Sequence, residues 1–315
     1  MKRIMVTGAL GQIGSELTLA LRARYGLDNV VACDIRDAVG HLADGPFQRA
    51  DCTDTAAIAA VVDRYEVDTI YHLASILSAS AEANPQRAWD VNMGALMAVL
   101  EVARARDCAV FNPSSIGAFG PGTPALHTPQ DTIQRPTSIY GITKVAGELL
   151  CDYYHQRYGV DARGLRFPGI ISNVTLPGGG TTDYAVAIYY KAVEEGRYTS
   201  FLRAGTRLDM MYMPDAVKAA IEVMEADPSR LSHRNAFNVT AMSVDPEDIA
   251  ASIRRHIPDF VLDYQIDPVR QGIADSWPDH MDDSAARYEW GWSPAFGLEA
   301  MTEDMLRVLR GRLGR

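Results

Sequence analysis

The first half of the chain alternates between short apolar runs and longer stretches in which apolar residues recur with helical spacing. The apolar runs predict strands at residues 3–7, 30–34, 69–73, 109–113 and 162–167. The helical patterns between them lie at residues 13–25, 55–65, 88–106 and 139–158. This order is typical of successive βαβ units, so we expect an α/β fold with a doubly wound parallel sheet of the Rossmann type.

After Phe167 the regular alternation gives way to glycine-rich and mixed segments. Helical patterns recur at residues 184–195, 214–226, 246–255 and 298–312, and short strands are predicted at 237–239 and 261–265. We therefore expect a Rossmann domain of residues 1–167. A smaller lobe of residues 168–315 would follow it, with some of its chain returning to the first domain, and would form the second wall of a ligand site.

Composition narrows the class of protein. The 315 residues are 47% hydrophobic and 22% charged, which is ordinary globular usage. A net charge of −10 argues against nucleic acid as a partner, because phosphates require a basic face. Glycine at position 8 comes too early for a signal peptide, and no apolar stretch approaches the roughly 20 residues of a membrane span. We expect no membrane association and a location in the cytoplasm or another reducing compartment.

The four cysteines, Cys33, Cys52, Cys108 and Cys151, form no C-x-x-C pair, and the histidines show no H-E-x-x-H spacing. We therefore expect buried free thiols and no metal site.

The first predicted strand leads directly into Gly8, Gly11, Gln12, Ile13 and Gly14, followed by a helix. Glycines at this turn let a pyrophosphate approach the backbone, and the helix N-terminus favours the anion. Twenty residues later, Asp34 ends the next strand, where a carboxylate accepts hydrogen bonds from ribose hydroxyls and repels a 2′-phosphate. The pattern predicts NAD as the cofactor, and the neighbouring Arg36 leaves NADP as the alternative.

Two further segments are candidates for contact with the dinucleotide. Asp51 and Cys52 follow a presumed third strand and offer a carboxylate and a backbone amide where adenine would lie. Leu73, Ala74 and Ser75 end another strand with residues small enough for close backbone approach. We interpret His72 as a packed, hydrogen-bonded histidine and not as a catalytic one.

The catalytic candidates are Tyr140 and Lys144, which lie one helical turn apart and share a face with Glu148. An ammonium beside the phenol, together with oxidised nicotinamide, stabilises the phenolate as a base for an alcohol proton. Ser114 and Ser115 lie at the end of a predicted strand, where a hydroxyl would hold the reacting oxygen. Either serine fits this role from the sequence.

Together these residues resemble the extended short-chain dehydrogenase/reductase superfamily, which includes nucleotide-sugar epimerases and dehydratases. Matching positions are Gly8, Gly11, Gly14, Asp34, Asp51, residues 72–75, Asn92, residues 114–120, Tyr140 and Lys144. The second half is similar to the epimerase-like L-threonine 3-dehydrogenases of that superfamily at residues 168–172, 180–185, 210–216, 238–241 and 277–291. The adjacent serines depart from the usual pattern, and register with the relatives favours Ser115.

The resemblance implies NAD-dependent oxidation of L-threonine to 2-amino-3-oxobutanoate, a step of threonine catabolism, in a homodimer built on helices 88–106 and 139–158. It adds Asn92, Phe167 and Pro168 as cofactor contacts, and places Ser78, Ser115, Tyr140, Gly180, Thr181 and Thr182 around the substrate. Thr181 and Thr182 also fit helix capping ahead of Asp183. The triple glycine 178–180 suits a hinged lid as well as a plain flexible loop.

Two other functions fit the same residues. A nucleotide-sugar epimerase or dehydratase would use the same serine, tyrosine and lysine, with Arg203, Arg207 or Arg270 contacting the second diphosphate. A non-catalytic NAD-binding redox sensor would need none of the three. The tryptophans Trp277, Trp290 and Trp292 are interpreted as packing residues and not as platforms for a substrate.

Overall fold

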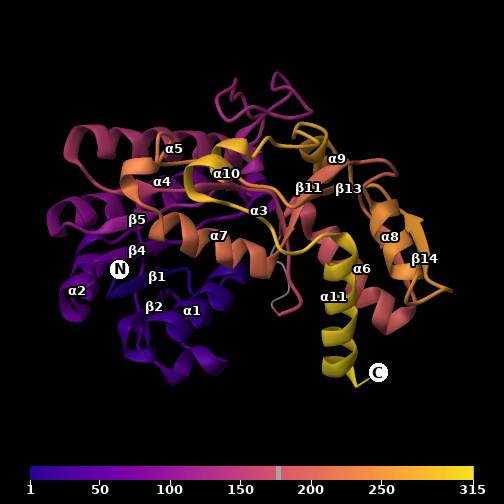
Figure 1. The fold of residues 1–315 in the computed structure, drawn as a ribbon, viewed down its shortest axis with the longest axis horizontal. Helices are drawn as coiled ribbons and strands as arrows, with labels where there is room; N and C mark the ends of the chain where they lie inside the picture. Colours follow the sequence, from indigo (N-terminus) through magenta and orange to yellow (C-terminus); the bar gives the residue numbers. More distant parts are fainter. Residues whose placement is uncertain (175–178, 315) are drawn as a thin grey trace.

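The computed structural model describes residues 1–174 and 179–314. Its centre is a parallel sheet of six strands in the order β3-β2-β1-β4-β5-β7 (Figure 1). The strands are β1 (Ile4–Thr7), β2 (Val30–Asp34), β3 (Phe47–Arg49), β4 (Thr69–His72), β5 (Ala109–Phe111) and β7 (Ala162–Arg163). The order reverses between β1 and β4, and ligands of such sheets bind at that switch point, beyond the carboxyl ends of the strands. The predicted Rossmann fold is confirmed.

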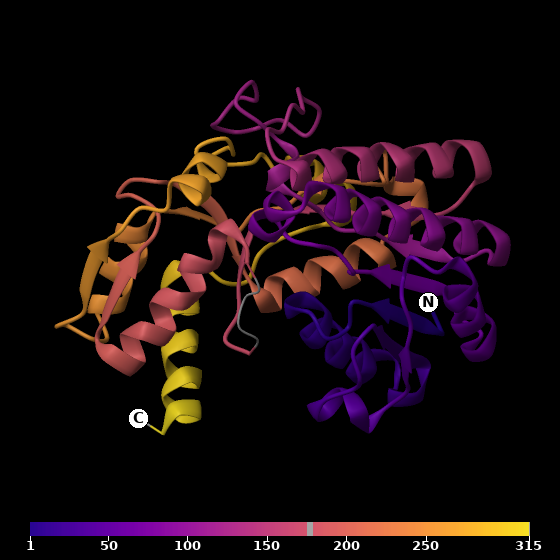
Figure 2. The same cartoon turned by 180° about the vertical axis from the view of Figure 1, so that it is seen from behind.

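Helices cover both faces of this sheet. On one face lie α2 (Thr55–Tyr65), α4 (Pro85–Arg106) and α5 (Ile139–Tyr158), and on the other lie α1 (Gln12–Tyr25) and α7 (Met213–Glu225). Figures 1 and 2 show α4 and α5 side by side along the sheet. Successive residues of β1 alternate between the two cores: Met5 packs with the α2 side, whereas Ile4 and Val6 pack with α1 and α7. Burial on both faces explains the continuous apolar runs of the strands.

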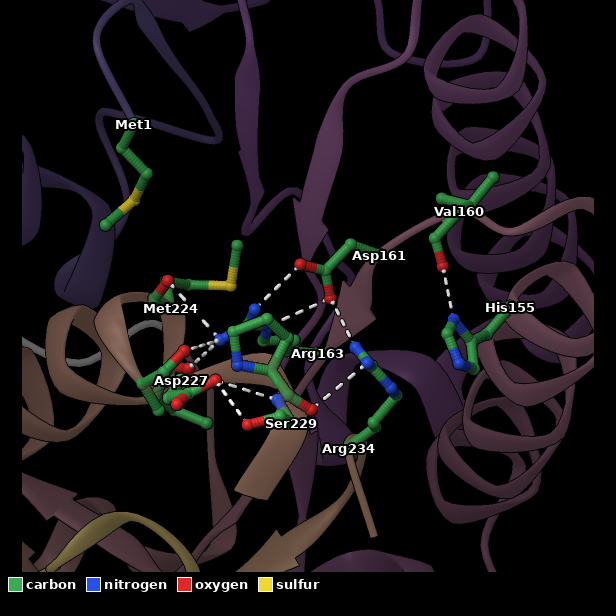
Figure 3. Close-up of polar contacts among 12 residues, drawn as sticks. Met1, His155, Val160, Asp161, Arg163, Met224, Asp227, Ser229 and Arg234 are labelled. Atoms are coloured by element: carbon green, nitrogen blue, oxygen red, sulfur yellow. Dashed lines mark hydrogen bonds and ion pairs between the residues drawn. The ribbon is translucent and has the colours of Figure 1, made fainter. Parts of the chain in front are cut away.

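Helix α7 comes from the second half of the chain but packs on the first. Arg163 of β7 fastens its end: Nη1 donates to the carbonyl oxygens of Val223 and Ala226, each at 2.8 Å, and Nη2 donates to Asp161 at 2.8 Å (Figure 3). The guanidinium thus satisfies carbonyls that a helix C-terminus leaves without intrahelical partners. The domain limits of 1–167 and 168–315 stay a prediction, with α7 as chain that returns to the first domain.

The lobe lies beside the sheet and has its own apolar core. Helices α6 (Tyr184–Glu195), α8 (Pro246–Arg254) and α11 (Leu298–Leu313) pack around residues such as Ile188 and Met305. Two small sheets complete it, one of β10 (Arg197–Ser200) with β14 (Val261–Tyr264) and one in the order β13-β11-β9. The latter strands are β13 (Met242–Val244), β11 (Leu208–Tyr212) and β9 (Gly169–Ile171). In Figure 1 the lobe is the orange and yellow region around α8 and α11.

Two predicted strands differ from the observed ones: one divides into two pieces, and the other ends at Phe111, two residues before its predicted end. The run 162–167 becomes β7 and β8 (Leu165–Phe167), and beyond the end of β5 lies β6 (Ser114–Ser115). Strands β6 and β8 pair with each other and with β12 (Phe237–Asn238) in a separate sheet. Gly164 lies at the break, where a Cβ atom would overlap the carbonyl oxygen of Asn112. This bend carries Ser115 and Phe167 out of the central sheet and toward the lobe.

Shorter elements near the cleft have no periodic pattern long enough to predict them. They include α3 (Ser78–Ala83), α9 (Pro268–Ala274), α10 (Ser284–Trp290) and the single turns η3 (Ile116–Ala118) and η4 (Thr181–Asp183). Within residues 1–174 and 179–314, every helix is too short or too polar to cross a membrane. The four cysteines are buried and free.

Candidate active site

A cleft of about 220 Å³ lies at the carboxyl ends of the central strands, between the sheet and the lobe. Most of the residues that the sequence singled out meet in its wall. From the first domain these are Gly8, Gly11, Gln12, Ile13, Gly14, Leu73, Ser75, Ser78, Ser114, Ser115, Tyr140, Lys144 and Phe167. From the second half they are Pro168, Gly180, Thr181 and Thr182.

The glycine turn between β1 and α1 is a close-packed cradle. Gly8 has φ +66°, and a Cβ atom there would lie 2.7 Å from the amide nitrogen of Ala74. A Cβ atom on Gly14 would overlap the carbonyl oxygen of Gly8. Beside this turn, the side-chain nitrogen of Gln12 is buried without a hydrogen-bond partner within the described residues. The pyrophosphate of a dinucleotide fits this turn for three reasons. The backbone is closed to side chains, the Gln12 amide has a hydrogen bond left to donate, and the N-terminus of α1 favours an anion.

Asp34 holds the glycine turn from the end of β2. Its Oδ2 accepts from the Leu10 amide at 3.0 Å, and its Oδ1 accepts from Nε of Arg36 at 3.0 Å. Burial acts to raise the pKa of Asp34, but these hydrogen bonds outweigh it and hold the pKa below its usual value. Asp34 is therefore an ionised acceptor at neutral pH, as ribose recognition requires. Arg36 occupies it here, so ribose hydroxyls would share or replace that ion pair.

Five predicted cofactor contacts lie outside the wall of this cleft: Asp34, Asp51, Cys52, Ala74 and Asn92. Asp51 accepts from the backbone and hydroxyl of Thr53 at 2.9 and 2.8 Å, and Cys52 is buried. Asn92 accepts from the Ile76 amide at 2.7 Å and donates to the Thr143 hydroxyl at 3.2 Å. Asn92 thus fixes the loop after β4 against α5, and its contact with the cofactor stays a prediction.

Tyr140 and Lys144 enter the cleft from the first turns of α5. Lys144 donates to the carbonyl oxygen of Pro113 at 2.8 Å, and its Nζ lies 5.3 Å from the centroid of the Tyr140 ring. The helix start is fixed by Ser138, whose hydroxyl accepts from the Gly141 amide at 3.1 Å. A Cβ atom on Gly141 would overlap the carbonyl oxygen of Gly117, so α5 packs directly on η3.

The two adjacent serines have different environments. The Ser115 hydroxyl accepts from the Gly117 amide at 3.1 Å, which leaves its proton available to a ligand in the cleft. The Ser114 hydroxyl donates to the buried carboxylate of Glu148. Because a hydroxyl has a single proton to donate, this geometry favours Ser115 as the group that contacts the reacting oxygen.

His72 is buried behind the cleft, and its Nδ1 lies 2.9 Å from the hydroxyl of Thr7. Burial, with a smaller contribution from the charge of Lys144, lowers the pKa of His72 to about 3. The imidazole is therefore neutral at physiological pH and hydrogen-bonded. These contacts agree with its interpretation as a packed histidine.

The lobe meets the first domain across the cleft at α3 and η4. The hydroxyls of Ser78 and Thr181 lie 3.3 Å apart, and the Ala79 amide donates to the Gly179 carbonyl at 3.2 Å. The Asp183 carboxylate accepts from the amides of Gly179 and Gly180, at 3.0 and 2.9 Å. Asp183 therefore orders this turn, and the threonine hydroxyls are not its caps. Gly178 of the predicted hinge lies outside the described residues.

The sequence did not identify several residues of the wall, of which Trp277 is the largest. Trp277 is only 8% exposed and belongs to the core of the lobe. The same side chain also lines the cleft. A Cβ atom on Gly117 would lie 3.3 Å from both Trp277 and Tyr140, which shows how closely the two rings approach. Trp290 and Trp292 pack in the core beneath α7, as expected. The remaining additions are Leu77, Pro113, Ile116, Gly169, Ile170 and Asp183.

The three arginines considered for a second diphosphate are engaged away from this wall. Arg203 pairs with Asp275 at 2.8 Å and Arg207 pairs with Asp248 at 2.7 Å. The guanidinium of Arg270 lies 4.3 Å from the centroid of the Phe201 ring. Among the described residues that line the cleft, Lys144 is the single lysine or arginine.

Sequence comparison identifies relatives along the whole chain. The profile of the NAD dependent epimerase/dehydratase family matches residues 4–240. A curated relative, an uncharacterized epimerase/dehydratase of Staphylococcus saprophyticus, is 56% identical over 314 residues, which cover 99% of this chain and 98% of the relative.

Solved structures of similar shape extend this finding. An L-threonine dehydrogenase from Clostridium difficile superposes with a TM-score of 0.97 and 55% identity, covering 99% of this chain and 98% of that one. The holo form of a GalE-like L-threonine dehydrogenase from Cupriavidus necator gives a TM-score of 0.95 and 50% identity, covering 98% and 99%. The similarity therefore includes both the Rossmann domain and the lobe.

Proposed function

This chain belongs to the NAD-dependent epimerase/dehydratase family, and we propose that it oxidises L-threonine to 2-amino-3-oxobutanoate as an L-threonine 3-dehydrogenase. One observation carries the proposal. The reacting residues Tyr140, Lys144 and Ser115 share a small cleft with the hydroxyls of Ser78, Thr181 and Thr182, with no guanidinium among its described lining residues. The solved L-threonine dehydrogenases that resemble the chain over its length support the substrate.

The chemistry divides between the cofactor and three side chains. Bound NAD⁺ supplies the hydride acceptor for the hydrogen on C3 of threonine. Tyr140 removes the proton of the C3 hydroxyl, with the Lys144 ammonium beside the ring to favour the phenolate. The Ser115 hydroxyl donates to the same oxygen and holds it next to Tyr140. NAD⁺ and threonine thereby yield NADH, a proton and the 3-oxo product.

The cofactor would lie along the sheet edge described above. Gly8, Gly11, Gln12, Ile13 and Gly14 would hold the pyrophosphate, and Asp34 would accept from the adenosine ribose. Leu73, Ser75, Phe167 and Pro168 line the same cleft closer to Lys144 and would flank the nicotinamide half. We also propose cofactor contacts outside the cleft wall. Asp51 and Cys52 would contact the adenosine half, and Ala74 and Asn92 would contact the dinucleotide from the loop after β4.

Threonine carries an ammonium and a carboxylate, both of which are costly to bury without partners. Gly180 and the hydroxyls of Ser78, Thr181 and Thr182 would supply those partners, because they line the cleft at the junction of η4 with α3. The substrate would therefore contact both domains at once. Its fit depends on their relative position.

A nucleotide-sugar epimerase is the second candidate, because it would use the same three reacting groups. A second diphosphate requires cations, and Arg203, Arg207 and Arg270 are engaged outside the cleft wall. A non-catalytic redox sensor is the third candidate. It would not require Ser115, Tyr140 and Lys144 to lie in one cleft, as they do here.

We propose further that the protein is a homodimer joined through α4 and α5. Both helices expose large apolar side chains on the outer surface, among them Trp89, Met97, Leu149 and Tyr153. Burying such a face against a second copy would be favourable. We place the enzyme in the cytoplasm, in keeping with its free thiols.

The experiment that tests the proposed function supplies the purified protein with NAD⁺ and a panel of alcohols, and follows NADH absorbance. We expect NADH from L-threonine and no change in UDP-glucose. Epimerised UDP-glucose without NADH from threonine would instead establish the epimerase. Cofactor binding with neither reaction would establish the sensor.

A further inference from the structure

Behind the reacting residues lies a buried ionic cluster that the proposed chemistry does not use. Its centre is Glu148 on α5, whose carboxylate receives Nε and Nη2 of Arg166 at 3.0 and 2.8 Å. Gln134 donates to the same carboxylate at 2.7 Å, and Ser114 donates to its other oxygen. The side chains of Glu148 and Arg166 are 4% and 8% exposed, so this is an ion pair inside the protein.

Arg166 is held on its other side as well. Its Nη1 donates to the carbonyl oxygen of Gln130 at 2.7 Å and to the side chain of Asn238 at 3.1 Å. Its guanidinium also lies 5.0 Å from the centroid of the Phe119 ring. These contacts hold the Arg166 guanidinium in one position. Because Glu148 pairs with that guanidinium, its carboxylate is held in place as well.

Three of the elements that this cluster joins, α5, β6 and β8, carry groups of the active site. Glu148 lies four residues after Lys144 and eight after Tyr140, on the same face of α5. Ser114 precedes Ser115 on β6, and Arg166 precedes Phe167 on β8. In the pairing of these strands, Ser114 lies opposite Arg166 and Ser115 lies opposite Phe167. The rotation of α5 and the twist of β6 are therefore set by the same carboxylate.

We propose that Glu148 and Arg166 are positioning residues for hydride transfer, which they serve by holding Tyr140, Lys144 and Ser115 in mutual register. They touch neither substrate nor cofactor. Alternate residues of a strand face opposite sides, so Ser114 can be fastened from behind while Ser115 faces the ligand. A displacement of about 1 Å among reacting groups can lower the rate on the order of 100-fold. Turnover should therefore depend on the contacts that hold these groups in place.

The chain offers a matched control in Arg163 and Asp161 (Figure 3). Arg163 is also a buried arginine, with a side chain 4% exposed, and it pairs with Asp161 at 2.8 Å. It lies three residues before Arg166, but its contacts are with the end of α7 and away from the reacting groups. Removing Arg166 takes the only ionic partner among the described residues from the buried Glu148 carboxylate, and removing Arg163 takes a donor from the carbonyls of Val223 and Ala226, so both losses should destabilise the fold.

The test compares Glu148→Gln, Arg166→Gln and Arg163→Gln in the full-length protein. Melting temperature, NAD⁺ affinity and the single-turnover rate of hydride transfer from L-threonine are measured for each, well below the lowest melting temperature. We expect Glu148→Gln and Arg166→Gln to lower the rate by about 10–100-fold with NAD⁺ affinity within about twofold of wild type. Arg163→Gln should melt earlier but keep the wild-type rate.

A second measurement needs no substrate, which matters because the rate test rests on the proposed function. Amide hydrogen exchange of residues 114–119 and 139–145 should be faster in Glu148→Gln and unchanged in Arg163→Gln. If wild type makes no NADH from threonine, the proposed function fails, and this exchange comparison still decides whether the cluster orders the site. Equal exchange in the two variants would overturn the inference, as would wild-type turnover in a folded Glu148→Gln.

Where Glu148→Gln does not fold, Ser114→Ala provides the milder change, because it removes one hydroxyl from the cluster. We expect it to lower the hydride-transfer rate by about 3–10-fold, with NAD⁺ affinity unchanged. In combination with Arg166→Gln its effect should be less than additive, because both act through the Glu148 carboxylate. Additive losses, or no loss in Ser114→Ala, would contradict the positioning role.

Discussion

The ammonium of Lys144 lies 5.3 Å from the centroid of the Tyr140 ring, one turn further along the same helix. Its hydrogen bond to the Pro113 carbonyl oxygen, at 2.8 Å, fixes the lysine between α5 and the end of the central sheet. The cation is thus held beside the phenol by the fold before any ligand arrives. A preorganised charge of this kind needs no rearrangement during the reaction.

Tyr140→Phe keeps the ring and removes the hydroxyl, so we expect the fold and NAD⁺ binding to persist. The rate of threonine oxidation should fall by about 10²–10⁴-fold, the usual contribution of a general base. The matched control is Tyr288→Phe, which removes a hydroxyl from an exposed side chain on α10 and should leave the rate unchanged. Near-normal turnover in Tyr140→Phe would remove this tyrosine from the mechanism.

Lys144→Met keeps an unbranched side chain one atom shorter than lysine, but removes both the charge and the hydrogen bond to Pro113. We expect weaker NAD⁺ binding and slower oxidation together, because the lysine serves the cofactor and the phenolate. Isothermal titration and steady-state kinetics separate the two effects. A variant with unchanged NAD⁺ affinity would show that the lysine acts on Tyr140 alone.

Asp34→Ala should weaken NAD⁺ binding and reduce the preference for NAD⁺ over NADP⁺. Loss of hydrogen bonds from ribose to a charged acceptor costs roughly 1–3 kcal/mol, and the lower end is expected because Arg36 already occupies the carboxylate. The double variant Asp34→Ala/Arg36→Ala serves as the control. If Arg36 holds the 2′-phosphate in the single variant, NADP⁺ binding falls again in the double one. Equal use of both cofactors by wild type would refute the role given to Asp34.

Asp209 on β11 makes the stability of the fold depend on pH. Burial is the main cause that raises its pKa to about 7, against the hydrogen bond from the Met281 amide at 2.6 Å that acts to lower it. The folded protein therefore holds this proton more tightly than the unfolded chain does. Stability should fall as pH rises from about 4 to about 7, where the unfolded carboxylate is already ionised.

Asp209→Asn removes this titration, so the variant should lose less stability than wild type over the same range. One pKa unit corresponds to about 1.4 kcal/mol, so the difference should reach a few kcal/mol in urea unfolding at pH 8 relative to pH 4. Asp263→Asn, at an exposed ion pair with Arg197, is the control and should follow wild type. Parallel pH curves for wild type and Asp209→Asn would contradict the assignment.

Periodicity was sufficient to predict five strands of the central sheet and its helices, because strands such as β1 are buried on both faces and read as continuous apolar runs. The short edge strand β3 is only partly buried and has no such run. Periodicity was insufficient where the backbone changes direction within one apolar run, as it does in residues 162–167. The separation of β7 from β8 depends on contact between Gly164 and Asn112, which are 52 positions apart. A pattern confined to neighbours along the chain carries no information about such a contact.

The candidate site shows the same division. Glycine spacing and the tyrosine–lysine pair are local, and the structure brings these residues into one cleft. The different environments of Ser114 and Ser115 depend on Glu148, which is more than 30 positions away. Trp277 has no local signal either, because an isolated tryptophan before a proline reads equally as core and as lining. Long-range packing decides both cases.

The most direct test of the account uses L-threonine with deuterium at C3, incubated with the protein and NAD⁺. Hydride transfer from C3 predicts one deuterium on C4 of the nicotinamide for each turnover, and a slower single-turnover rate than with unlabelled threonine. The Tyr140→Phe variant should show the same transfer at a much lower rate. NADH without deuterium, or no NADH from threonine while UDP-glucose is epimerised, would contradict the proposed reaction.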